Sequence, residues 1–205
     1  VSTIPSLDSD SSTQQVQLSP WANLSSEAQQ VDWLILHFNH WFSHLNVTLV
    51  RGEFEPEYFP ASTNSPARIQ FAHGFFNSAL HEISHWTIAG DKRRLLPDLG
   101  YWYAPDGRTR EQQALFEQVE IKPQAIEWMF AQAFGRKFRV SLDNLTGDGG
   151  DGASFKDNVY AQVQAYFNGT AKLPCDAARF IQCICICIRG GKSLQSDEFI
   201  REILD

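Results

Sequence analysis

The sequence lacks long apolar runs and an excess of positive charge. Its longest apolar runs are far shorter than the roughly 20 residues of a membrane-spanning helix, so it predicts neither a membrane protein nor a membrane partner. Lysine and arginine number 17 against 24 acidic residues, which gives a formal net charge of −7. Because a dedicated nucleic-acid binder carries a basic surface, we expect no direct contact with nucleic acid.

The sequence also lacks cysteine outside one short stretch. Its four cysteines are Cys175, Cys183, Cys185 and Cys187. A disulfide framework in a secreted domain distributes cysteines along the chain, so their clustering favours a cytoplasmic protein. From 183 to 188 cysteine alternates with isoleucine. A soft-metal site is one interpretation of three thiols at this spacing, but an apolar segment with unreactive cysteines is favoured.

Length and composition predict one folded domain. With 205 residues, 23.2 kDa and 43% apolar residues, the chain can bury a hydrophobic core. Residues 1–22 are rich in small polar side chains and predict a disordered N-terminal tail. Residues 23–190 are the expected domain, and 191–205 are a C-terminal segment whose structure the pattern does not define.

The hydrophobic pattern predicts an α+β fold. Apolar residues at helical spacing predict helices over 26–45, 75–89, 109–134 and 155–167. Strands are expected at 47–50, 69–72, 101–103 and 138–142. Ser26 and Gln29 form a capping box, Pro123 is expected to bend its helix, and the proline-containing segment 53–67 is expected to be irregular. Because strands and helices do not alternate regularly, the fold class is α+β rather than doubly wound.

One motif carries recognisable chemistry, the sequence His-Glu-Ile-Ser-His at residues 81–85. Helical residues four apart share a face, so His81 and His85 can bind one metal ion. Random order would produce this motif in about one such sequence in a hundred, so the motif alone is a hypothesis. Its setting in an apolar helical segment favours a metal site over two polar residues at the edge of a core helix.

A third protein ligand is expected, because two imidazoles are too few for a stable site. The predicted helix 109–134 offers Glu111, Glu117, Glu120 and Glu127. At about 100° per residue, Glu117 lies nearly opposite the apolar face and Glu120 lies at its flank. We expect Glu120 as the third ligand and Glu117 as the second choice. The alternative is that both are solvated surface acids.

The ligand types alone leave the chemistry open. Two histidines and a carboxylate fit a zinc site in which Glu82 is the general base to a metal-bound water. They also fit a non-haem Fe(II) site that activates O₂. The spacing by itself favours a zinc metallopeptidase, and a non-enzymatic binding module with a structural metal is a third hypothesis.

Several segments beyond the motif resemble the bacterial elongation factor P hydroxylase family. The similar segments, within about residues 30–185, are 71–75, 81–86, 100–103, 105–108, 116–125, 143–145 and 178–181. Their combination is highly specific. The alternating cysteines at 183–188 depart from the family, which is helical and aromatic there, and this piece is expected to be altered.

The resemblance implies a metal-dependent monooxygenase with an α+β fold. Its substrate would be the modified lysine of elongation factor P, after a β-lysyl group has been attached, and that factor would be the protein partner. The resemblance implies a two-histidine-one-carboxylate site in which His81, His85 and Glu120 bind a divalent metal ion, expected to be Fe(II), with Glu82 beside it as the catalytic residue. Glu117 lies in the same matching segment, so the resemblance alone does not choose the carboxylate.

A modified lysine is a long cation, so its site is expected to offer carboxylates and aromatic faces. The predicted substrate-binding residues are Trp86, Tyr101 and Tyr103, with Trp102, Asp98 and Asp106 as further choices. For each aromatic residue, packing is the favoured alternative.

Other histidines and one loop carry weaker signals. His73 is expected either beside the metal ligands or in the core. His37, His40 and His44 share one stripe of the helix predicted at 26–45. A second metal site is one interpretation of this stripe, but solvated or half-buried histidines are favoured. The glycine-rich stretch at 147–152 lacks the calcium-loop pattern and is expected to be only a loop.

Overall fold

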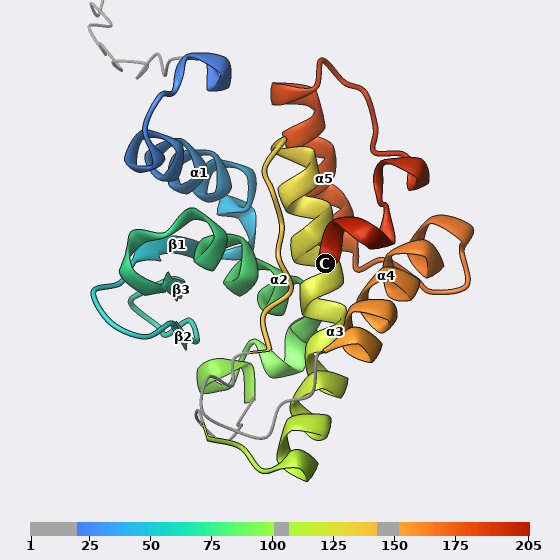
Figure 1. Ribbon diagram of the computed structural model, residues 1–205. Helices are drawn as coiled ribbons and strands as arrows, with labels where there is room; N and C mark the ends of the chain where they lie inside the picture. Colours follow the sequence, from blue (N-terminus) through green and yellow to red (C-terminus); the bar gives the residue numbers. More distant parts are fainter. Residues whose placement is uncertain (1–19, 101–106, 143–151) are drawn as a thin grey trace, which may run out of the picture.

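The computed structural model of the protein describes residues 20–100, 107–142 and 152–205 (Figure 1). Its described residues form five α-helices and one three-stranded sheet, which confirms the α+β class. Figure 1 shows the strands and α1 on one side of α2, with α3, α4 and α5 on the other. Most of the predicted tail at 1–22 and the predicted strand at 101–103 lie outside the described residues.

Helix α1 (Glu27–Trp41) begins as its capping box predicts. The Ser26 side chain accepts a hydrogen bond from the Gln29 backbone N–H, and the Gln29 side chain accepts one from the Ser26 backbone N–H. The α-helix ends at Trp41 rather than near residue 45, because a 3-10 turn follows at Ser43–Leu45. Asn46 then adopts a φ of 51°, the left-handed conformation that asparagine tolerates, before the first strand begins.

The sheet has the strand order β1-β3-β2. Strand β1 (Val47–Arg51) is parallel to β3 (Ala67–Phe71), and β2 (Glu57–Phe59) is antiparallel to β3. The expectation that the whole segment 53–67 is irregular was wrong, because β2 lies within it. Pro56 and Pro60 flank this strand instead of interrupting it, so neither removes a ladder hydrogen bond.

The sheet buries one face. Side chains alternate along a strand, and the apolar set Val47, Leu49, Ile69 and Phe71 is buried. Arg68, between two buried neighbours on β3, is exposed and lies over the ring of Phe59. The buried face packs against α1 and α2, and this contact fixes α2 relative to the strands.

Helices α2 (Phe76–Arg93) and α3 (Arg110–Ala133) pack against each other and form the centre of the molecule. Gly90 interrupts the regular helical geometry of α2 with a φ of 64°. This residue directly follows the predicted helix 75–89, and helical geometry resumes after it. Thr109 and Gln112 form a capping box for α3, which continues through Pro123.

The segment after α3 corrects another prediction. Residues 138–142 pair with no strand among the described residues. The Gln124 side chain instead accepts a hydrogen bond from the Ser141 backbone N–H at 2.9 Å and donates one to the Ser141 carbonyl at 2.7 Å. A side-chain amide therefore satisfies the backbone groups that a neighbouring strand would have paired.

The C-terminal part is helical. Helix α4 (Ala153–Asn168) matches the predicted helix at 155–167, and the alternating cysteines lie in α5 (Cys175–Ile188). All four thiols are free, and burial raises the pKa values of Cys183, Cys185 and Cys187. A raised pKa keeps these groups as thiols, which agrees with the favoured interpretation of unreactive cysteines.

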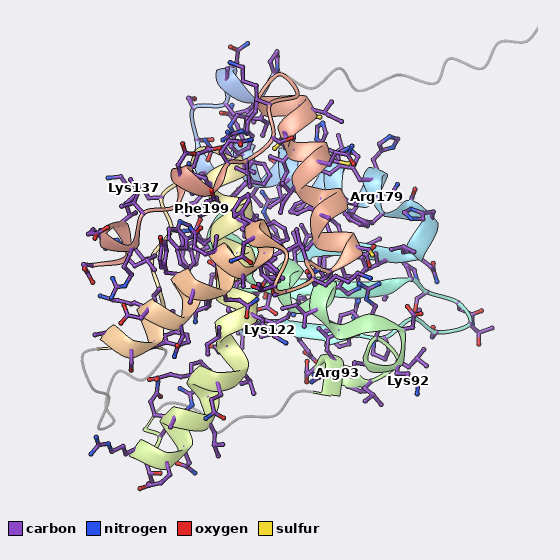
Figure 2. The ribbon with its side chains drawn as sticks, turned by 90° about the vertical axis from the view of Figure 1, so that its right-hand side faces the viewer. Lys92, Arg93, Lys122, Lys137, Arg179 and Phe199 are labelled. Carbon is purple, nitrogen blue, oxygen red and sulfur yellow. The ribbon has the colours of Figure 1, made fainter. Side chains whose placement is uncertain are left out.

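The core is rich in aromatic rings. Phe180 of α5 is fully buried, and its ring centroid lies 4.8 Å from that of Phe130 and 5.8 Å from that of Phe38. Near the C-terminus, Phe199 is 2% exposed, and its ring centroid lies 5.1 Å from that of Trp128. Figure 2 shows Phe199 within the body of the molecule and Lys137 and Arg179 on its outside. Among the described residues, no helix combines the length and the apolar character needed to cross a membrane.

Candidate metal centre

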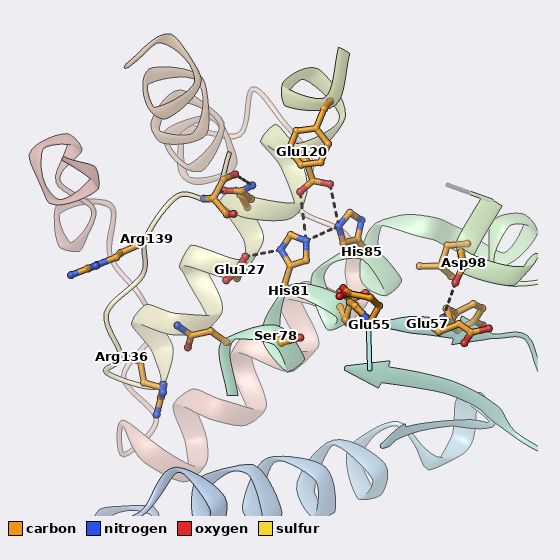
Figure 3. Close-up of a pocket in the computed structure, with 18 of the residues that line it drawn as sticks. Glu55, Glu57, Ser78, His81, His85, Asp98, Glu120, Glu127, Arg136 and Arg139 are labelled. Carbon is orange, nitrogen blue, oxygen red and sulfur yellow. Dashed lines mark hydrogen bonds and ion pairs between the residues drawn. The ribbon is translucent and has the colours of Figure 1, made fainter. Parts of the chain in front are cut away.

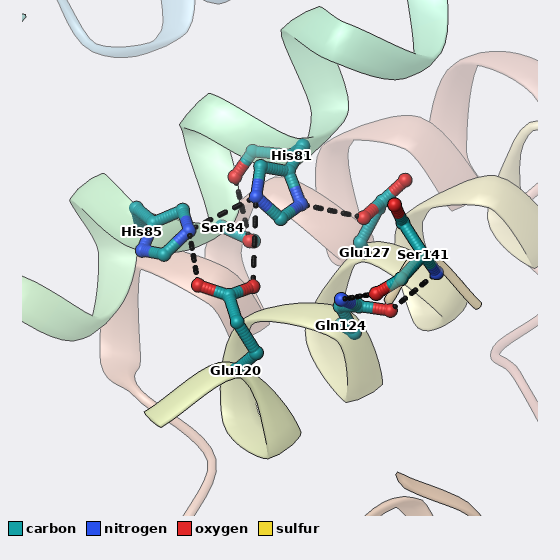
Figure 4. Close-up of polar contacts among 7 residues, drawn as sticks. All are labelled: His81, Ser84, His85, Glu120, Gln124, Glu127 and Ser141. Atoms are coloured by element: carbon teal, nitrogen blue, oxygen red, sulfur yellow. Dashed lines mark hydrogen bonds and ion pairs between the residues drawn. The ribbon is translucent and has the colours of Figure 1, made fainter. Parts of the chain in front are cut away.

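Helix α2 presents two histidines beside its core face. Phe76, Leu80 and Ile83 are fully buried against the core, which fixes the rotation of the helix about its axis. His81 and His85, four residues apart, therefore point to one side, and their Nε2 atoms lie 3.0 Å apart (Figure 4). His85 is 3% exposed, whereas 27% of the His81 side chain is exposed.

Helix α3 brings a carboxylate to these rings. The oxygens of Glu120 lie 3.2 Å from His85 Nε2 and 3.6 Å from His81 Nε2. Glu120 is 1% exposed, so its carboxylate is almost completely removed from solvent. Burial acts to raise the pKa of Glu120, but the neighbouring imidazoles of His85 and His81 hold it below its usual value. The carboxylate is thus kept ionised in a buried place.

These three residues could hold a metal ion. Their ligand atoms all lie within 4.8 Å of one another, and no other group of this kind occurs within 20–100, 107–142 and 152–205. Nitrogen and carboxylate ligands each bind such ions at about 2.0–2.2 Å, so neighbouring ligand atoms around one ion lie roughly 2.8–3.6 Å apart. The observed spacings of 3.0, 3.2 and 3.6 Å meet this requirement. A cation would also offset the cost of burying this carboxylate.

A second glutamate of α3 contacts the outer edge of the His81 ring. Oε2 of Glu127 lies 2.8 Å from His81 Nδ1, the nitrogen that faces away from His85. Glu127 is 9% exposed. Burial would lower the pKa of His81, but the hydrogen bond and charge of Glu127, together with the charges of Glu120 and Glu82, raise it to about 10.

One face of α3 carries the polar groups of the site. Glu120, Gln124 and Glu127 follow the helical spacing of four and three residues, so they share this face. Glu120 and Glu127 contact the histidines, and Gln124 between them holds Ser141 (Figure 4). The segment after α3 is therefore fixed as a wall beside the centre.

The centre opens into a cavity of about 1030 Å³ (Figure 3). Its walls differ in charge: Glu55, Glu57 and Asp98 lie on the side of the sheet, and Arg136 and Arg139 lie on the opposite side. Glu82 also lines the cavity, beside the ligands. Burial raises the pKa of Glu82, although the charges of His81 and His85 oppose this.

Two comparisons with known proteins bear on this geometry. The model of the elongation factor P hydroxylase family matches residues 37–199. The chain belongs to this family. The elongation factor P lysine hydroxylase of Haemophilus influenzae is 52% identical over 135 residues, which are 65% of this chain and 76% of that protein.

Membership of the hydroxylase family confirms the resemblance and the prediction of an enzyme. It favours a hydroxylase over the metallopeptidase and the non-enzymatic binding module. Within the family match, the structure brings together His81, His85 and Glu120, the residues that the sequence predicts as ligands. Glu117, the second choice, lies outside this cluster and accepts a hydrogen bond from Gln113.

The structure separates the predicted substrate-binding residues. Trp86 is 1% exposed, packs edge-on against Phe38 and Phe42, and has the Arg94 guanidinium over its ring. It belongs to the core rather than to the cavity, which corrects the predicted substrate contact: its position on α2 faces away from the histidine pair. Asp98 does line the cavity. Tyr101, Trp102, Tyr103 and Asp106 lie outside the described residues.

The remaining histidines do not join the centre. His73 is exposed in a turn with a φ of 50°, so neither of its two expected places was right. His37 is half-buried, and its ring stacks on that of Trp33 with the centroids 3.6 Å apart. His40 and His44 are exposed, so the three histidines are solvated or half-buried as expected. Most of the predicted loop at 147–152 lies outside the described residues.

Sequence reasoning missed the contacts that surround the ligands. Glu127 was one of four available glutamates, and its place two turns after Glu120 was the available signal for its role beside the site. The contact between Gln124 and Ser141 carried no sequence signal, because the two groups meet only after the chain folds back along α3.

Proposed function

We propose that this protein is a non-haem iron monooxygenase that hydroxylates the β-lysyl-modified lysine of elongation factor P. The observation that carries the proposal is the convergence of His81, His85 and Glu120 at a cavity, in a chain of the elongation factor P hydroxylase family. The relative from Haemophilus influenzae bears the name of that activity. A translation factor as substrate would place the reaction in the cytoplasm, as the clustered cysteines predict.

His81, His85 and Glu120 would hold the metal ion in this enzyme. Two imidazoles and one carboxylate leave coordination positions open, and this ligand set is typical of non-haem iron oxygenases. A bound ferrous ion would supply the activation of O₂. The protein contributes two helices whose packing holds the three side chains in place before any ion binds.

Glu82 is proposed as the catalytic acid or base. It lines the cavity next to both histidines, and its raised pKa favours a protonated carboxyl at a higher pH than usual. Reduction of O₂ consumes protons, and a carboxyl with a raised pKa can hold and release one at its Oε atoms. The same property would serve a peptidase, so it is the family membership that favours the hydroxylase.

The cavity fits a cationic side chain. Its volume of about 1030 Å³ lies at the upper end of the range for ligand sites. On the sheet side it presents the carboxylates of Glu55, Glu57 and Asp98, which would attract the amino groups of a β-lysyl-lysine. Asp98 is held in place because its Oδ1 accepts a hydrogen bond from the Tyr58 backbone N–H at 3.0 Å.

The direct test is oxygen incorporation into the substrate. Elongation factor P with a β-lysyl-modified lysine is incubated with the iron-loaded protein, O₂ and a two-electron reductant. One oxygen atom should enter a C–H bond of the modified lysine and the other should leave as water, so mass spectrometry should show a gain of one oxygen. Unmodified elongation factor P and the His81→Ala variant serve as controls. Peptide cleavage without oxygen gain would contradict the proposal and support the zinc peptidase.

A further inference from the structure

The role of Glu127 goes beyond the three ligands. We propose that Glu127 is a positioning residue, which orients the His81 ring and keeps a proton on its Nδ1 so that Nε2 is the nitrogen offered to the metal. This inference rests on the proposed metal site. It assigns a task to a buried carboxylate that the ligand set does not use.

The two edges of the His81 ring face different partners. Its Nε2 lies 3.0 Å from His85 Nε2 and 3.6 Å from Glu120, and its Nδ1 lies 2.8 Å from Glu127 Oε2. The lone pairs of the two ring nitrogens point away from each other. A carboxylate at Nδ1 therefore cannot also reach an ion held at Nε2, so Glu127 is not a fourth ligand.

The hydrogen bond at Nδ1 determines which nitrogen binds the metal. An ionised carboxylate only accepts hydrogen bonds, so the contact with Glu127 requires a proton on Nδ1. When the ring is neutral, that proton leaves Nε2 with a free lone pair. A carboxylate partner of this kind also fixes the orientation of a metal-binding histidine and makes it a stronger base.

Burial and helix geometry hold Glu127 in this place. Glu127 is 9% exposed. It lies seven residues after Glu120 on α3, so both carboxylates face α2 from the same side of one helix. Burying a carboxylate without a partner is unfavourable, and the His81 N–H is the partner that the structure provides. The two side chains are therefore coupled, and removal of the Glu127 carboxylate frees the His81 ring to rotate.

Metal affinity is the first test, with Fe(II) alone as the probe under anaerobic conditions and a chromophoric chelator as competitor. Removal of such a partner typically weakens metal binding 10- to 100-fold, and we expect a loss in this range for Glu127→Ala. The loss should be smaller for Glu127→Gln, because the amide oxygen can still accept the Nδ1 proton. Glu117→Gln is the matched control on the same helix. Its Fe(II) affinity should stay within about twofold of wild type, a change much smaller than the 10- to 100-fold loss expected when a histidine loses its hydrogen-bond partner.

A second readout separates positioning from a general effect on folding. In the Zn(II)-loaded protein, ¹⁵N NMR of the histidine rings should show His81 bound through Nε2 with a proton on Nδ1. In Glu127→Ala this signal should become heterogeneous, while circular dichroism and the unfolding midpoint of the apo protein remain close to those of Glu117→Gln. A single unchanged His81 signal in Glu127→Ala would contradict the proposal.

Two affinity results would also overturn it. If Glu127→Ala binds Fe(II) as tightly as wild type, Glu127 does not position His81. If binding is lost as completely as in His81→Ala, Glu127 is itself a ligand. Failure of the wild-type protein to bind any metal would be a different result, because it would overturn the metal site and the proposed function together with this inference.

Discussion

Helices α2 and α3 carry two regions of opposite chemistry. On one side, Phe76 and Trp86 of α2 and Phe130 of α3 are buried in the aromatic core that surrounds Phe180. On the other side, the same two helices present His81, His85, Glu120 and Glu127 to each other. The two regions share their backbone, so the packing of the first fixes the geometry of the second.

The difference between the two regions is energetic. Burial of apolar side chains is favourable, whereas a buried carboxylate such as Glu120 is desolvated and is compensated in part by its imidazole neighbours. The aromatic region therefore stabilises the fold, and the polar region is retained at some cost in stability. Substitutions should separate these roles: core variants should lose stability, and site variants should lose metal binding or activity.

The largest effect is expected from the ligands. His81→Ala, His85→Ala and Glu120→Ala should each reduce metal content to background, because the two remaining side chains are too few to hold an ion. Metal is measured by mass spectrometry of the purified, metal-reconstituted proteins. Glu117→Ala is the matched control and should retain metal. A wild-type metal content in either histidine variant, or an exchange of results between the two glutamates, would contradict the assignment.

The next largest effect is expected in the aromatic region. Phe180→Ala should lower the free energy of unfolding by about 3–5 kcal/mol, because it removes a fully buried ring and leaves a cavity. Urea denaturation measures this change. Below the unfolding transition, the variant should still bind metal, since Phe180 does not touch the ligands. A folded variant that cannot bind metal would show that the two regions are less separable than their packing suggests.

Glu82→Gln should act on the reaction alone. We expect hydroxylation to fall at least about 100-fold, the lower range for loss of a general acid or base, with metal content equal to wild type. Turnover of β-lysyl-modified elongation factor P, measured by mass spectrometry, gives the first quantity. Full activity of Glu82→Gln would exclude a catalytic role for this carboxyl.

The smallest effect is expected at the wall of the cavity. Gln124→Ala removes two hydrogen bonds to Ser141, each worth about 0.5–1.5 kcal/mol. Stability should fall by about 1–3 kcal/mol in urea denaturation, with metal content unchanged. Gln118→Ala, at an exposed position of α3, should change stability by less than about 0.5 kcal/mol. Equal stabilities of the two variants would argue against the role of Gln124 in holding this segment.

Much of this architecture is encoded locally. The capping residues Ser26 and Thr109 mark the starts of α1 and α3, and hydrophobic spacing outlines α1 to α4, whereas α5 was not predicted. Helical periodicity also placed Glu120 rather than Glu117 beside the core, and the structure agrees. The short strand β2 was missed because three residues between prolines give too short a pattern. Trp86 was misplaced because an aromatic residue next to a motif does not reveal which way it points.

The sequence by itself determined four of the five described helices, the α+β class, the histidine pair and the preferred carboxylate, because each depends on patterns within single segments. Only the tertiary structure decided that Glu127 contacts His81, 46 residues away, and that Gln124 fixes Ser141 across 17 residues. The first contact depends on how α2 and α3 are rotated and packed against each other, and the second depends on how the chain folds back along α3. Local periodicity specifies the faces of a helix, but only packing decides which faces meet.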